Sequence, residues 1–105
     1  MSMGASTNEQ ISAEVKRRVD ELQSKSFPDL ESLPETNTQT LEVASARVTM
    51  TVYRTHRPNG DLLVVVQASR EFLWGIYHTF FVRGFVASVT GAKSKAAEEL
   101  LWEYT

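Results

Sequence analysis

Apolar residues near the start of the chain recur every three or four positions: Ile11, Val15, Val19 and Leu22. Charged residues fill most of the positions between them, which is typical of an amphipathic helix. The pattern predicts a helix over residues 8–24. The spacing of Ser6 to Glu9, or of Thr7 to Gln10, would form a capping box at its first turn. We expect residues 1–7 to be a flexible tail and residues 8–105 to form a single domain.

The period changes to two between residues 40 and 55. Val48, Met50 and Val52 alternate with polar or aromatic residues, as in a half-buried strand. Leu41 and Val43 have the opposite parity, so a bulge near residues 44–46 is expected within this strand. The preceding segment, 26–39, is predicted to be a connector anchored to the core by three apolar residues: Phe27, Leu30 and Leu33.

A hairpin is predicted at Asn59-Gly60, because this pair favours a type I′ turn. Residues 61–68, DLLVVVQA, are apolar on both faces and predict a central strand. Residues 69–71 are expected to be the next turn.

An aromatic-rich segment, EFLWGIYHTFFVRGFVASV, spans residues 71–89. Its uncharged run covers only 72–82, whereas a membrane-spanning helix needs roughly 20 mostly apolar residues. We interpret it as β structure, either one strand bent at Gly75 or two strands separated by a break at Arg83-Gly84. As one strand it would place Phe80 on one face and Tyr77 and Phe81 on the other.

The chain closes with a second amphipathic pattern that predicts a helix over residues 92–104. The predicted fold class is therefore α+β. We expect a two-layer α-β-β-β-α domain in which both helices cover one face of an antiparallel meander of three or four strands.

Two helices on one face would leave the other face of so apolar a sheet uncovered. Monomers rarely expose a large contiguous apolar patch, so a partner is expected there. The alternative is that the 26–39 connector crosses this face. Four aromatic residues are the predicted partner-binding anchors: Tyr53, Tyr77, Phe81 and Phe85. The expected partner is a second copy, giving a homodimer, or another protein.

Composition favours a non-enzymatic module. The net charge is −2, there is no cysteine, and the N-terminus lacks an apolar signal segment, so we expect a cytoplasmic protein without a metal or a cofactor. His56 lies in the predicted hairpin and is expected to be exposed. His78, with Glu71 or Asp61, is the one candidate for acid–base catalysis, and no motif spacing supports it.

A second interpretation concerns the start of the last predicted helix. The sequence TGAKSKAAEELL, Thr90 to Leu101, resembles the same region of double-stranded-RNA-binding domains, which also run α-β-β-β-α. The resemblance implies phosphate contacts from Lys93 and Lys95. The candidate anion- or nucleic-acid-binding residues are five: Thr90, Gly91, Lys93, Ser94 and Lys95.

Overall fold

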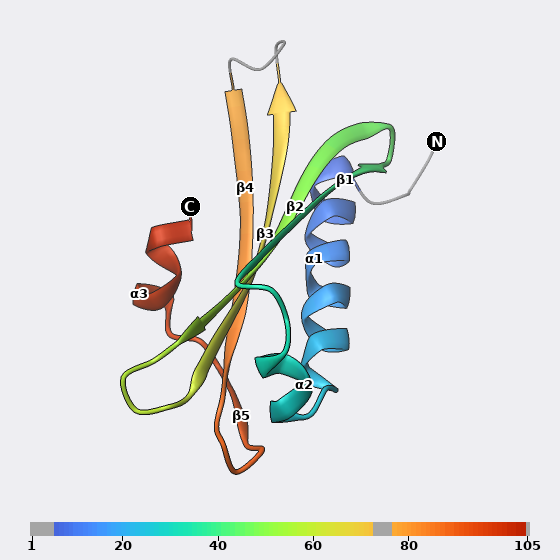
Figure 1. Cartoon of the computed structure of the whole chain (residues 1–105). Helices are drawn as coiled ribbons and strands as arrows, with labels where there is room; N and C mark the ends of the chain where they lie inside the picture. The colour runs from blue at the N-terminus through green and yellow to red at the C-terminus, as the bar shows by residue number, and fades with distance from the viewer. Residues whose placement is uncertain (1–5, 73–76, 105) are drawn as a thin grey trace.

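The computed structural model describes residues 6–72 and 77–104, and it describes no side chain at 71–78, 98, 99 or 103. The fold is α+β, as predicted: helices pack on one open antiparallel sheet (Figure 1). The main helix, α1, spans Thr7–Gln23, and the short α2 spans Phe27–Glu31. The short C-terminal helix α3, Glu98–Leu101, continues as a 3-10 turn, Trp102–Tyr104.

Helix α1 follows its prediction closely. Its four apolar positions are all buried, and Ser6 is its N-cap. The Ser6 hydroxyl oxygen accepts a hydrogen bond from the Glu9 amide at 3.1 Å, and the Glu9 carboxylate accepts one from the Ser6 amide at 3.0 Å. The bonds from Ser6 lower the pKa of Glu9, because they stabilise its ionised form.

Five strands form the sheet, where three or four were expected. They are β1 (Thr36–Val43), β2 (Ala46–His56), β3 (Leu62–Phe72), β4 (Tyr77–Ala87) and β5 (Lys93–Lys95). Their order in the sheet follows their order in the chain, and each neighbouring pair is antiparallel. The predicted central strand is confirmed, because β3 lies in the middle.

The predicted bulge near residues 44–46 is instead a tight turn between β1 and β2. Ala44 and Ser45 have φ of 51° and 67°, and Val43 pairs with Ala46 across the turn. The Asn59-Gly60 hairpin is confirmed in place, but only Gly60 has a positive φ, so its turn is not type I′. The Asn59 side chain instead accepts a hydrogen bond from the Asp61 amide at 3.0 Å.

The aromatic-rich segment contributes to two strands. The predicted turn at residues 69–71 is wrong, since β3 continues through it to Phe72, which pairs with Tyr77 of β4. A break at Arg83-Gly84 is also absent, because β4 runs through both residues. The alternative bend at Gly75 lies outside the described residues.

The core has two layers, one on each face of the sheet. Helices α1 and α2 cover the first face, where Val64, Val66 and Phe85 are fully buried. Phe27, Leu30 and Leu33 of the connector also pack into this layer, so the connector does not cross the opposite face. We call this side the α1 face.

The second layer lies on the opposite face, which we call the α3 face. Leu63 and Val65 of β3 are buried there beneath Ala96, Leu100 and Leu101. The expectation that both helices share one face is therefore wrong, as Figure 1 shows. The predicted helix over 92–104 is shorter than expected, because residues 93–95 pair with β4 as β5.

Gly84 allows the C-terminal segment to approach β4. A Cβ atom at this position would lie 2.8 Å from the Val64 carbonyl oxygen and 3.1 Å from Cδ2 of Leu101. We therefore expect Gly84→Ala to lower the free energy of unfolding by about 1–3 kcal/mol, through overpacking against backbone. Urea denaturation measures this change.

Gly60→Asn is the matched control, because position 60 has open space and asparagine tolerates a positive φ. It should cost less than Gly84→Ala. Equal stability of Gly84→Ala and the wild-type protein would show that Val64 and Leu101 do not lie as close to position 84 as described.

Candidate functional site

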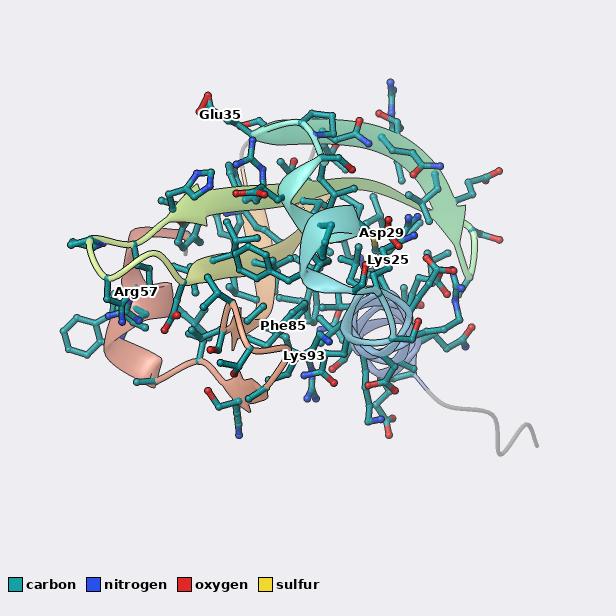
Figure 2. All side chains as sticks on the ribbon, turned by 60° about the horizontal axis from the view of Figure 1, so that its bottom comes forward. Lys25, Asp29, Glu35, Arg57, Phe85 and Lys93 are labelled. Atoms are coloured by element: carbon teal, nitrogen blue, oxygen red, sulfur yellow. The ribbon has the colours of Figure 1, made fainter. Side chains whose placement is uncertain are left out.

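The four aromatic residues predicted to bind a partner do not form one surface. Phe85 is fully buried beneath α1, and Figure 2 shows it in the packed interior. Phe81 is half-buried on the same face, whereas Tyr53 lies on the α3 face. The side chain of Tyr77 lies outside the described residues. Phe85 is therefore a core residue in this structure and is not accessible to a partner.

Tyr53 anchors the C-terminal segment. Its ring centroid lies 4.8 Å from that of Tyr104, and its hydroxyl donates a hydrogen bond to the Gln67 side-chain oxygen at 3.3 Å. The side-chain Nε2 of Gln67 in turn donates a hydrogen bond to the Tyr104 backbone carbonyl. These contacts assign Tyr53 a role within the chain, since they fix the segment that covers Leu63 and Val65.

The rest of the α3 face is more polar than expected. On β1 and β2 it carries threonines at alternating positions: Thr36, Thr38, Thr40, Thr49 and Thr51. Thr38 and Thr51 are bonded to each other through their hydroxyl oxygens at 3.1 Å. Among the described residues, the sheet therefore leaves no broad aromatic face bare. Phe80, on β4, is the large apolar side chain of this face that is most exposed, at 45%.

A different feature becomes the candidate site: the outer side of β4. β5 pairs only with Phe85–Ala87, although β4 is eleven residues long. Within the described part of the chain, no strand pairs with the outer side of residues 77–83, which we call the β4 edge. Such an edge can accept a strand from another molecule.

The direction of the backbone groups along the β4 edge follows from one hydrogen bond. The Gly84 carbonyl accepts from the Ala96 amide, at 3.1 Å, on the side away from β3. Because the N–H and C=O groups of a strand residue point to the same side and alternate along the strand, those of Val82 also face outward. Those of Phe81 and Arg83 face β3.

A groove runs beside this edge, between α1 and the end of the sheet. Its volume is about 770 Å³. Val15, Val19 and Phe81 supply apolar lining, and Arg83 and Lys95 lie at its sheet side. Four residues of α1 form its polar wall: Ser12, Lys16, Asp20 and Gln23. We call it the β4 groove.

Positive charge prevails in the β4 groove. Lys16 Nζ and Asp20 Oδ2 form an exposed ion pair at 2.9 Å. In the part of the chain that the structure describes, neither Arg83 nor Lys95 has a carboxylate partner. A partner that fills the groove therefore meets a strip of apolar side chains bordered by cations.

The five predicted anion-binding residues lie together, but not at a helix start. The chain from Ser88 to Ala92 forms a turn in which the Ser88 amide donates to the Ala92 carbonyl at 2.8 Å. Gly91 has φ of 95° within it, and β5 follows immediately. The helix begins only at Glu98, so the geometry that the RNA-binding resemblance requires is absent.

His56 forms no catalytic group with the described side chains around it. His56 is exposed, with Nε2 3.4 Å from Glu31 and Nδ1 3.2 Å from Arg54. The side chains of His78 and Glu71 lie outside the described residues, and Asp61 is engaged in the Asn59 turn. The described residues contain no cluster of three or more potential metal ligands.

No helix within residues 6–72 and 77–104 is long and apolar enough to cross a membrane. Comparison with family models, with curated proteins and with solved structures finds no significant match for this chain. The β4 edge and the groove beside it are the features of the described residues that suggest a binding function.

Proposed function

We propose that this chain is a non-enzymatic protein-association module that binds an extended strand along the β4 edge. One observation carries the proposal: β5 covers only Phe85–Ala87, so the preceding part of β4 ends the sheet next to a partly apolar groove. Strand addition of this kind gains affinity from main-chain hydrogen bonds and specificity from alternate side chains.

The two sides of the added strand would meet different surroundings. On the α1 face, alternate side chains would enter the β4 groove beside Phe81 and Arg83. On the α3 face, the others would contact Val82 and Leu101, which also line the groove wall. Both sides thus offer apolar contacts, which an isolated edge in water would lack.

Val82→Pro tests strand addition, because proline removes the outward-facing N–H without removing a hydrogen bond to β3. The probe is a blocked, fluorescein-labelled octapeptide of alternating threonine and valine, followed by fluorescence anisotropy. We expect the wild-type protein to bind this peptide. Val82→Pro should bind it at least about tenfold more weakly, because the backbone N–H donor at position 82 is lost and the proline ring keeps the peptide strand away from β4.

Val82→Thr is the matched control, since it has nearly the same shape and keeps the N–H. It should bind the peptide as the wild-type protein does. Circular dichroism of both variants checks that the sheet is intact. Equal binding by the proline and threonine variants, or no binding by the wild-type protein, would contradict strand addition at this edge.

Nucleic-acid binding is the second candidate, because Arg83, Lys93 and Lys95 occupy neighbouring positions on the α1 face of β4 and β5. It predicts charge-driven binding to RNA. That binding should weaken as salt rises and fall roughly tenfold in Lys93→Glu/Lys95→Glu. A filter-binding titration at two salt concentrations measures both effects, and indifference to the double substitution would remove this candidate.

A further inference from the structure

We propose that the outer side of β1 is a self-association site, where β1 of a second copy pairs antiparallel with it about a two-fold axis through Gln39. We call this side of the strand the β1 edge. The inference goes beyond the proposed function, because β1 lies at the opposite end of the sheet from β4 and β5. Two copies joined in this way would share one continuous antiparallel sheet.

The β1 edge is open along its whole length within the described part of the chain. β1 is the first strand of the sheet and pairs only with β2, over all eight residues from Thr36 to Val43. Apart from this ladder, no backbone hydrogen bond among the described residues involves β1. Figure 2 shows Glu35, which directly precedes β1, at the margin of the molecule. The backbone groups of this edge are therefore available to another strand.

The usual protection of an edge strand is missing from β1. Lysine, proline and bulges keep exposed edges from pairing with other molecules. From Thr36 to Val43 the sequence TNTQTLEV contains neither lysine nor proline, and its register with β2 runs without a bulge. The strand is thus suited to pairing on its outer side as well.

The direction of the backbone groups follows from one hydrogen bond next to β1. The Glu35 carbonyl accepts from the Arg54 amide of β2 at 2.9 Å. Because the direction alternates along a strand, the odd-numbered residues of β1 face β2 and the even-numbered ones face outward. The outward-facing positions are Thr36, Thr38, Thr40 and Glu42.

An antiparallel pairing centred on Gln39 uses every one of these positions. It sets Thr38 opposite the partner's Thr40, and Thr36 opposite the partner's Glu42. Each outward-facing position thus meets another one, as a hydrogen-bonded pair requires. The pairing is isologous, so it uses the β1 edges of both copies and closes at two.

The neighbouring registers pair less of the strand. A centre at Thr38 would set Glu42 opposite the partner's Pro34, which has no N–H to donate. A centre at Thr40 would set the first residue of β1 opposite the partner's Ala44, which lies in the turn after the strand. The proposed axis therefore gives the longest ladder.

The side chains of the β1 edge complement themselves. On the α3 face, Thr38 would lie beside the partner's Thr40, and threonine pairs across strands are stabilising. On the α1 face, Gln39 would meet the partner's Gln39. The Arg18 guanidinium donates to the Gln39 side-chain oxygen at 3.2 Å and so orients this side chain. Hydroxyl and amide groups both donate and accept hydrogen bonds, so identical groups can bond each other.

Charge favours a second copy as the occupant of β1. The strand has one charged residue, Glu42, which the proposed axis sets opposite the partner's Thr36, so no like charges lie opposite each other. The other edge of the sheet carries three cations, Arg83, Lys93 and Lys95, which oppose the pairing of two copies there. A strongly charged or strongly apolar strand would find no counterpart on β1, whereas a second β1 does.

Cysteine cross-linking tests the axis, because the chain has no cysteine of its own. Across the axis, position 39 forms a non-hydrogen-bonded pair with a Cα separation of about 4.5 Å, which suits a disulfide. We expect Gln39→Cys to form a covalent dimer with diamide at micromolar concentration, at least about tenfold faster than Thr36→Cys. Thr36 is exposed on the same strand but would meet the partner's Glu42, so it controls for random collision. Non-reducing electrophoresis with intact mass measures the products.

Thr40→Pro tests the same ladder without a cysteine. Proline removes the outward-facing N–H at position 40 and leaves the hydrogen bonds to β2 in place. Sedimentation equilibrium should give a dimer for the wild-type protein at the same concentrations, and a dimer dissociation constant at least about tenfold higher for Thr40→Pro. Thr40→Val keeps the N–H and nearly the same shape, so it should dimerise far more strongly than the proline variant. Circular dichroism checks that the sheet of both variants is intact.

Three results would overturn self-pairing through β1. The first is a monomeric wild-type protein in sedimentation. The second is cross-linking of Gln39→Cys no faster than that of Thr36→Cys. The third is a dimer that Thr40→Pro leaves intact, because another surface would then join the copies. These variants concern β1 and the Val82→Pro test concerns β4, so this inference and the proposed function fail separately.

Discussion

The fold depends on one constraint: β3 is buried on both of its faces. Its residues Leu62 to Val66 are each at most 7% exposed, and they alternate between the α1 face and the α3 face. A strand this apolar must be packed against other elements on both faces, because each apolar side chain exposed to water would lose the stabilisation that its burial provides. Helix α1 supplies the first cover, and the short C-terminal segment supplies the second. The outer edge of the sheet receives less protection, because strand pairing along the outer side of β4 is limited to Phe85–Ala87, where β5 reaches it.

Much of the architecture could be predicted from local pattern. The helix over Thr7–Gln23, the Asn59-Gly60 hairpin and the central position of β3 each follow from a signal contained in a few neighbouring residues. The turn at Ala44-Ser45 could not be predicted, because neither residue is typical of positive φ. Residues 93–95 have a pattern compatible with a helix, but pairing with β4 makes them a strand, so tertiary context overrides propensity there.

The candidate site was less accessible to prediction. Whether a strand has an unpaired edge depends on the length and position of the neighbouring strands. β5, Lys93–Lys95, is too short to produce a recognisable strand pattern in the sequence. The face on which each aromatic lies also depends on the chain reversal between Phe72 and Tyr77, which sets the parity of β4 against β3. That parity places Phe85 in the core with α1, whereas Tyr53, on β2, lies on the opposite face. Residue types alone therefore grouped four aromatics that the fold separates.

The order of the strands has a consequence for how the chain folds. Each strand hydrogen-bonds only with the strands that precede and follow it in the sequence, so no pairing requires a distant segment to be found first. The entropy lost in closing each loop is small for such short connections, and the sheet can grow one hairpin at a time. Helix α1 is the exception, because it lies first in the sequence and yet its main contacts, with β3 and β4, involve residues from the second half of the chain. Contact order therefore predicts that its docking on the sheet is slower than the closing of the hairpins.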